Sequence, residues 1–129
     1  MFEELRQIIE ENDSIVIFGH INPDGDCYGS QIGLRDLLRL NYPNKKVFAV
    51  GSGWHRFFDF IGTMDEVEDD VIKQSLAILV DGNDCDRMED QRVWNAKAHI
   101  KIDHHIENYK FRIWTYCSMS IKIIFKFFN

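Results

Sequence analysis

Residues 15–30 read IVIFGHINPDGDCYGS, and this stretch joins a strand signal to a cluster of polar side chains. Residues 15–19 form a continuous apolar run, which is typical of a strand buried on both faces of a parallel sheet. The run leads directly into His20, Asp24 and Asp26. Because ligands bind beyond the carboxyl ends of the strands in an open parallel α/β sheet, the stretch predicts a sheet with a site at this edge.

Two further apolar runs, residues 77–80 and 99–102, also end in polar side chains. The side chains that follow them are Asp81, Asp103, His104 and His105. The carboxyl ends of parallel strands lie at the same edge of a sheet, so we expect these residues to meet those of the first stretch. Imidazole and carboxylate groups gathered in one crevice indicate a metal centre.

The alternation of helical and strand-like patterns predicts the fold class, an α/β, doubly wound, mostly parallel sheet with helices on both faces. The predicted strands are residues 15–19, 46–50, 77–81 and 98–102, and the predicted helices are residues 2–11, 29–40 and a short aromatic-rich segment, 54–61. We also expect a turn at residues 71–75 and a helical or irregular segment at residues 87–96. The strand order should be 2-1-3-4, with right-handed crossovers.

Composition and charge limit the function classes. The chain has 129 residues, 45% of them hydrophobic, which suffices for one domain with a substantial core. Its net charge of −6 excludes the broad basic surface of a duplex-DNA binder. The three cysteines form no C-x-x-C pair, which argues against a disulfide framework and against a thiolate zinc site. The charged N-terminus and the lack of a long apolar run predict a cytoplasmic chain without a membrane span.

The last twenty residues, 110–129, differ in composition from the rest of the chain. They contain no Asp or Glu but four basic residues, together with much Phe and Ile. One interpretation is a final basic, aromatic strand or helix that packs on the sheet. The other is that this segment did not evolve with the rest, because its narrow vocabulary of Ile, Lys, Phe and Asn resembles an AT-rich stretch translated out of frame. An exposed apolar end would also favour aggregation. We therefore divide the chain into residues 1–109 and an atypical tail, residues 110–129.

The first polar motif allows three interpretations. Pro-Asp-Gly at residues 23–25 is a strong turn signal, so an ordinary surface turn is one of them. The alternating oxygen side chains suit the start of a calcium loop, but Gly33 stands where the closing glutamate is needed. What remains is one imidazole and two carboxylates, a set that suits manganese, iron, cobalt or magnesium better than structural zinc. A helix that begins near Gly29 and Ser30 would aim backbone N–H groups at a phosphate in the same crevice.

The other two motifs carry their own alternatives. Asp81 either caps the following helix or bridges two metal ions about 3.5 to 4 Å apart, the separation found in two-metal phosphoesterases. Arg87 either contacts a phosphate or pairs with a neighbouring acid. Asp103 precedes two histidines, so it can orient one metal-bound imidazole while the other meets the substrate. The remaining acids of this region are interpreted as a solvated face: Asp84, Asp86, Glu89 and Asp90.

These three motifs resemble the first three motifs of the DHH phosphoesterase superfamily. The residues that carry the resemblance, within residues 14–109, are His20, Asp24, Asp26, Gly29, Ser30, Asp81, Asp103, His104 and His105. The motifs look most similar to the oligoribonuclease and 3′-phosphoadenosine-5′-phosphate phosphatase branch. Pyrophosphatases and cyclic-dinucleotide phosphodiesterases of the superfamily are the nearest competitors. The resemblance implies a Rossmann-like domain and manganese-dependent hydrolysis of phosphodiester or phosphomonoester bonds in short oligoribonucleotides or nucleoside 3′,5′-bisphosphates.

The resemblance also implies a role for each residue. The implied metal ligands are His20 and Asp24 for one manganese ion, Asp26 and His104 for the other, and Asp81 as the bridge. The implied catalytic residues are Asp81, Asp103 and His105, and the implied substrate contacts are His105, Arg87 and Ser30. Two divalent cations would activate a water for in-line attack on phosphorus, so no covalent nucleophile is required.

Two features of the family are missing from this sequence: a fourth motif with a further metal-binding Asp, and a second domain with a glycine-rich substrate motif. The sequence therefore predicts a truncated domain whose turnover is at least about 100-fold below that of an intact relative. The alternative is a non-catalytic metal- or nucleotide-binding remnant. Short RNA or a nucleotide is the expected partner, without a membrane, and the resemblance allows a homodimer for the intact parent.

Overall fold

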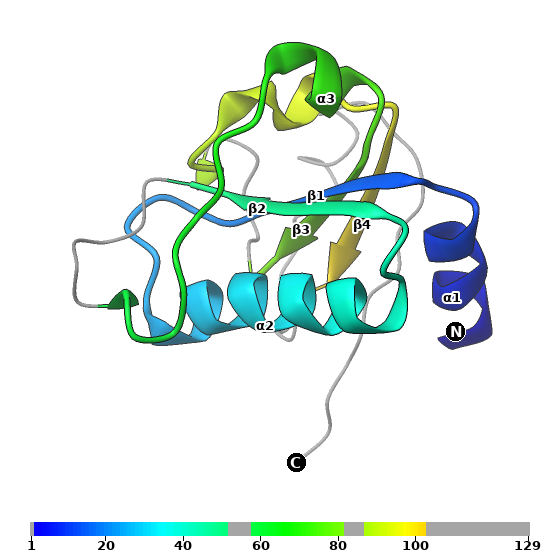
Figure 1. Cartoon of the computed structure of the whole chain (residues 1–129). Helices are drawn as coiled ribbons and strands as arrows, with labels where there is room; N and C mark the ends of the chain where they lie inside the picture. The colour runs from blue at the N-terminus through cyan, green and yellow to red at the C-terminus, as the bar shows by residue number, and fades with distance from the viewer. Residues whose placement is uncertain (1, 52–57, 82–86, 103–129) are drawn as a thin grey trace.

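The structure of the chain is a computed structural model that describes residues 2–51, 58–81 and 87–102. In chain order its elements are α1 (Phe2–Glu10), β1 (Ser14–Phe18), α2 (Gly25–Asn41), β2 (Lys46–Val50), α3 (Asp69–Lys73), β3 (Leu76–Val80), the 3-10 helix η3 (Gln91–Asn95) and β4 (Ala98–Ile102). The strands form a parallel sheet with the order β2-β1-β3-β4, which Figure 1 shows with α2 lying along one face. The predicted fold class and strand order are confirmed.

The side chains of β1 alternate between two hydrophobic cores, one on each face of the sheet. Ile15 and Ile17 belong to one core, whereas Val16 and Phe18 belong to the other. The residues of β3 alternate in the same way, and every residue of this strand is buried. Because both faces are covered, these central strands need apolar side chains at every position, which explains their continuous apolar runs.

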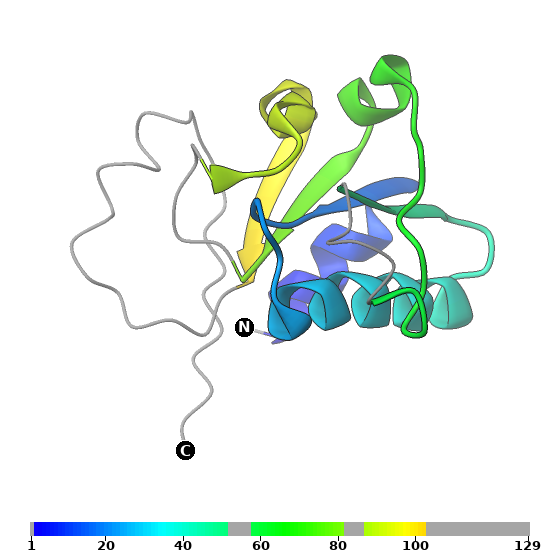
Figure 2. The same cartoon turned by 90° about the vertical axis from the view of Figure 1, so that its left-hand side faces the viewer.

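Helices cover both faces of the sheet. Helices α1 and α2 pack on one face through Ile9, Ile32 and Leu38. On the other face, α3 and η3 contribute Ile72 and Val93 to the second core. Figure 2 shows this layering from the side, with α2 on one side of the sheet and α3 and η3 on the other. This two-sided cover is the doubly wound arrangement that the sequence predicts.

Helix α2 begins at Gly25, about one turn earlier than the sequence predicts. Its N-cap residue is Asp24, whose carboxylate accepts a hydrogen bond from the backbone N–H of Cys27 at 2.8 Å. The prediction of a helix start near Gly29 and Ser30 is therefore wrong, and Ser30 lies exposed in the second turn. Turn-forming residues suit a helix start as well as a loop, so the periodicity of the apolar residues alone places the start too late.

The shorter predicted segments have mixed outcomes. The segment 71–75 overlaps α3, and the segment 87–96 contains η3. The helix predicted over residues 54–61 falls partly outside the described residues, which resume at Phe58. The division between residues 1–109 and 110–129 also falls outside them and stays a prediction. Among the described helices, the longest has 17 residues, and none has the length and apolar character needed to span a bilayer.

The prediction that Asp90 belongs to a solvated acidic face is wrong. Its side chain is only 18% exposed, and its Oδ2 pairs with Arg92 Nη2 at 2.8 Å. Burial alone would raise the pKa of Asp90, but hydrogen bonds from the side chain and the backbone N–H of Arg92 hold that pKa below its usual range. Glu89 is half-buried, and the predictions for Asp84 and Asp86 lie outside the described residues.

Candidate metal centre

The carboxyl end of β1 requires a glycine because α2 approaches it closely. A Cβ added to Gly19 would lie 2.3 Å from Gln31 Oε1 and 2.8 Å from Cys27 Sγ. Gln31 is 1% exposed, and its Nε2 donates hydrogen bonds to the carbonyls of Ile17 at 3.2 Å and Val50 at 3.0 Å. Gln31 therefore ties α2 to the ends of β1 and β2, which fixes the first turns of this helix against the sheet edge.

His20 follows this glycine and lies beside the segment that precedes η3. It forms an isolated antiparallel bridge with Met88, and the backbone N–H of Ile21 donates to the carbonyl of Arg87 at 2.6 Å. His20 Nδ1 lies 2.8 Å from the carbonyl oxygen of Ile21. Because a carbonyl oxygen only accepts, this contact requires a proton on Nδ1, and the tautomer with that proton has its lone pair on Nε2. Nε2 is therefore the nitrogen that can bind a metal.

Asp81 follows β3 in an uncommon backbone conformation. Its φ is 52°, in the left-handed region that Asp tolerates better than most residues with a side chain. Its backbone N–H donates to the carbonyl of Ile102 at 3.2 Å, which ties the turn to the end of β4. The residue is only 7% exposed. A buried carboxylate held at a strand end in this conformation is typical of a functional site.

The ends of β1 and β3 bring His20 and Asp81 together. His20 Nε2 lies 3.6 Å from Asp81 Oδ2. Ligand atoms about 2.1 Å from one cation lie roughly 3 to 4 Å apart, so this separation fits a shared metal ion. An imidazole lone pair and a carboxylate oxygen that face each other also repel unless a proton or a cation lies between them. The two residues therefore fit the metal centre that the sequence predicts.

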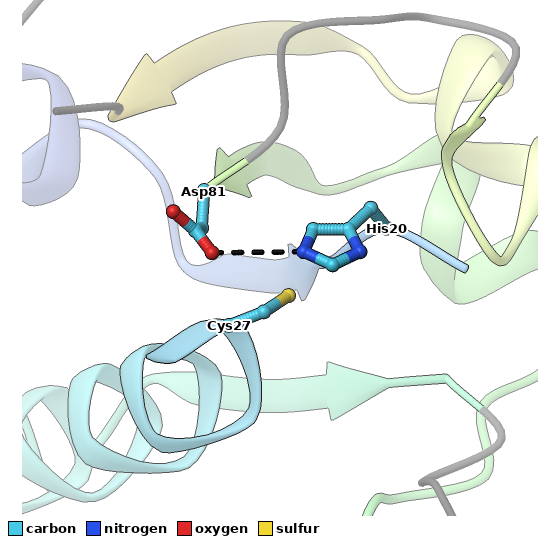
Figure 3. A group of neighbouring side chains, drawn as sticks. All are labelled: His20, Cys27 and Asp81. Atoms are coloured by element: carbon cyan, nitrogen blue, oxygen red, sulfur yellow. Dashed lines mark ion pairs between the residues drawn. The ribbon is translucent and has the colours of Figure 1, made fainter. Parts of the chain in front are cut away.

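A third side chain, Cys27 from the first turn of α2, completes the cluster. One ligand atom each from His20, Cys27 and Asp81 lies within 4.8 Å of the other two. Figure 3 shows the three side chains directed toward a common centre from the loop after β1, from α2 and from the end of β3. The arrangement offers one nitrogen, one sulfur and one oxygen to a cation.

Cys27 is the member of this cluster that the sequence does not predict as a ligand. Burial raises the pKa of its thiol to about 12, and the negative charges of Asp81, Asp24 and Asp26 add to the increase. The sulfur is therefore a neutral thiol when no cation is bound. One feature of the sequence could have identified Cys27 as a ligand: it stands three residues after the N-cap, in the first turn of a helix that packs on the sheet edge.

The other predicted site residues divide into two groups. Asp24 caps α2 and Asp26 lies exposed in its first turn, so both stand at the helix end that carries Cys27. Arg87 is exposed in the segment that runs beside the loop after β1. The predictions for Asp103, His104 and His105 lie outside the described residues, so their roles as ligands or substrate contacts stay predictions.

Comparisons with known proteins show which family this sequence resembles. Residues 14–128 match the DHH family, N-terminal domain. Over 103 residues the chain is 42% identical to the bifunctional oligoribonuclease and PAP phosphatase NrnA of Mycoplasma pneumoniae, covering 75% of this chain and 32% of the relative. It is 39% identical to NrnA of Bacillus subtilis over 105 residues, covering 81% and 33% of the two chains. Identity to the cyclic-di-AMP phosphodiesterase GdpP of Bacillus subtilis is 30% over 122 residues, covering 78% and 18%.

The chain belongs to the DHH family, because the family match extends over most of its length. The predicted resemblance to this family and to its oligoribonuclease and phosphatase branch is confirmed. The chain spans about a third of the length of the NrnA relatives.

Proposed function

We propose that this chain is a phosphoesterase domain that hydrolyses phosphodiester or phosphomonoester bonds in short oligoribonucleotides or nucleoside 3′,5′-bisphosphates with two divalent cations, manganese by preference. The observation that carries this proposal is the convergence of His20 and Asp81, 3.6 Å apart, from the ends of two different strands. The NrnA relatives, whose names combine an oligoribonuclease with a PAP phosphatase, support the substrate class.

The proposed ligand set extends this pair. The ligands are His20 and Asp24 for one cation, Asp26 and His104 for the other, and Asp81 between them. The cations, when bound, supply activation of the attacking water and neutralise the charge of the phosphate. Asp81 suits a bridge because its backbone is held at the junction of β3 and β4, so both carboxylate oxygens stay at the sheet edge. We assign Asp103 the role of orienting a ligand imidazole.

Substrate positioning falls to residues around this centre. Arg87 is exposed beside the loop that carries His20, where a guanidinium can donate two parallel hydrogen bonds to a phosphate. We assign His105 and Ser30 to contacts with the same substrate.

An assay of the purified chain tests the proposal. With excess manganese, the chain should release inorganic phosphate from 3′-phosphoadenosine-5′-phosphate and mononucleotides from a dinucleotide RNA, measured by chromatography. Asp81→Asn should lower kcat/KM at least about 100-fold, because it removes a charge from the proposed bridge between the cations. Asp70→Asn is the matched control, since Asp70 is an exposed carboxylate of α3 and the chemical change is the same. Equal activity of the two variants would contradict the proposed role of Asp81.

A second candidate substrate is a cyclic dinucleotide, which the 30% identity to the phosphodiesterase GdpP favours. The same assay with cyclic di-AMP separates the two. Hydrolysis of cyclic di-AMP at a higher kcat/KM than the bisphosphate and the dinucleotide would replace the first proposal. Manganese binding without hydrolysis of any of these substrates, or of inorganic pyrophosphate, would instead support a non-catalytic binding remnant.

For the cellular setting we propose the cytoplasm, with no membrane partner, and a homodimer for the whole protein.

A further inference from the structure

The sulfur of Cys27 holds a defined position at the proposed metal centre. Cys27 is fully buried. Its backbone N–H is fixed by the N-cap bond to Asp24, and its Sγ packs over the backbone of Gly19, where an added Cβ would come within 2.8 Å. The thiol also donates to Gln31 Oε1 across 4.0 Å. These contacts leave the sulfur directed at the space between His20 and Asp81, as Figure 3 shows.

We propose that His20, Cys27 and Asp81 form a nitrogen, sulfur and oxygen site that binds a thiophilic divalent cation, zinc or cadmium. The inference rests on the proposed metal centre and adds a ligand to it. Thiolate ligands favour zinc and related soft cations, whereas carboxylates and water favour manganese and magnesium. The presence of the sulfur therefore changes which cation this end of the centre prefers.

The geometry suits such a cation. Zinc binds sulfur at about 2.3 Å and imidazole nitrogen or carboxylate oxygen at about 2.0 to 2.2 Å, so the ligand atoms lie roughly 3.3 to 3.7 Å apart. His20 Nε2 and Asp81 Oδ2 already stand 3.6 Å apart. The whole set lies within 4.8 Å, so small side-chain rotations close it around one ion. Three protein ligands leave the fourth tetrahedral position open for water or a substrate oxygen.

Charge balance supports the same conclusion. A divalent cation that coordinates a thiol displaces its proton, so the bound site combines one thiolate, one carboxylate and two positive charges. The sum is zero. A neutral cluster is the form that burial tolerates best, because an uncompensated charge in a buried site is costly. Zinc bound here would occupy two of the ligands proposed for manganese, His20 and Asp81, so the two metals should compete.

The test measures thiolate coordination directly. The full chain with Cys85→Ser and Cys117→Ser keeps Cys27 as its single cysteine. Titration with cadmium should produce a thiolate-to-metal charge-transfer absorption that saturates at one cation per chain, and zinc should displace it. Adding Cys27→Ser should abolish the absorption and raise the zinc Kd at least about 10-fold, while the manganese Kd changes less than about 3-fold.

A second pair of variants tests whether the sulfur acts together with its neighbours. His20→Ala and Asp81→Asn keep the thiol but each remove one partner, so each should raise the cadmium Kd at least about 10-fold. Asp70→Asn, in exposed α3, is the control and should leave it unchanged. Circular dichroism verifies that each variant is folded.

The outcomes separate this inference from the proposed function. No cadmium–thiolate absorption at saturating metal, or an absorption that neither partner variant weakens, would overturn the three-ligand site even if manganese-dependent hydrolysis is present. The absorption without any manganese-dependent hydrolysis would support the three-ligand site and count against the proposed function alone.

Discussion

Replacing Gly19, which directly follows β1, by Ala should destabilise this protein more than the same change at Gly25, Gly29 or Gly33 of α2. The added Cβ would lie 2.3 Å from Gln31 Oε1, well inside van der Waals contact. Gln31 cannot turn away cheaply, because it is 1% exposed and donates to the carbonyls of Ile17 and Val50. Displacing it loses two hydrogen bonds and leaves buried polar groups without partners, at a cost of roughly 2 to 4 kcal/mol in the free energy of unfolding.

Equilibrium unfolding in urea, followed by circular dichroism, measures this cost. A double-mutant cycle assigns it to its cause: in a Gln31→Ala background the clash with the amide disappears and only the 2.8 Å approach to Cys27 Sγ remains, so Gly19→Ala should then cost less than it does in the wild-type background. Gly33→Ala is the matched control. An added Cβ at Gly33 meets nothing within 4 Å, so this change should stabilise α2 by up to about 1 kcal/mol.

A loss below about 0.5 kcal/mol for Gly19→Ala would refute the reasoning, since the close approach of α2 would then carry no energetic weight. An equal loss in the wild-type and Gln31→Ala backgrounds would show that the amide is not its source.

Three further predictions concern the pH dependence of stability, a buried hydrogen bond and metal binding. The free energies of unfolding of wild type and Asp90→Asn should converge as pH falls, because hydrogen bonds from Arg92 hold the pKa of the Asp90 carboxyl below its usual range. The ionised carboxylate stabilises the folded chain at a pH above its ordinary pKa of about 3.9. That stabilisation is lost as pH falls through the lower pKa of the folded state. A pH-independent difference in urea unfolding would contradict this. Tyr28→Phe should cost about 1 to 2 kcal/mol in the same assay, because the hydroxyl of this buried residue donates to the Gly62 carbonyl at 2.5 Å; an unchanged unfolding midpoint would rule it out. Manganese at 100 times its Kd should stabilise the chain by about 2.7 kcal/mol, measured as a rise in Tm, and Asp81→Asn should remove most of that gain; an equal rise in both proteins would argue against Asp81 as a ligand.

The fold was largely predictable because its pattern is local. The apolar runs of β1 and β3 have no alternation, which indicates burial on both faces, and the structure places successive residues of each strand in opposite cores. The boundaries were less predictable. The start of α2 depends on Asp24 accepting a hydrogen bond from Cys27, a capping contact that competes with the turn that the same residues can form.

The candidate site was predictable in part, through the rule that parallel strands deliver their ends to one edge. That rule brings together His20 and Asp81, which lie far apart in the sequence. No such rule predicts that Cys27 belongs to the site, because a cysteine in the first turn of a helix reaches the site only if the helix packs closely on the strand ends. That packing depends on the glycine at position 19 and on the amide of Gln31.

The sequence by itself determined the elements of this protein and the chemistry at their ends, since strand burial and the succession of His and Asp residues after the strands are properties of short segments. Only the tertiary structure decided which of these groups face one another and at what distance. The 3.6 Å approach of His20 to Asp81, and the sulfur beside them, result from the pairing of β1 with β3 and the docking of α2. Such contacts join residues separated by many positions, and their distances are set by packing that no short segment contains.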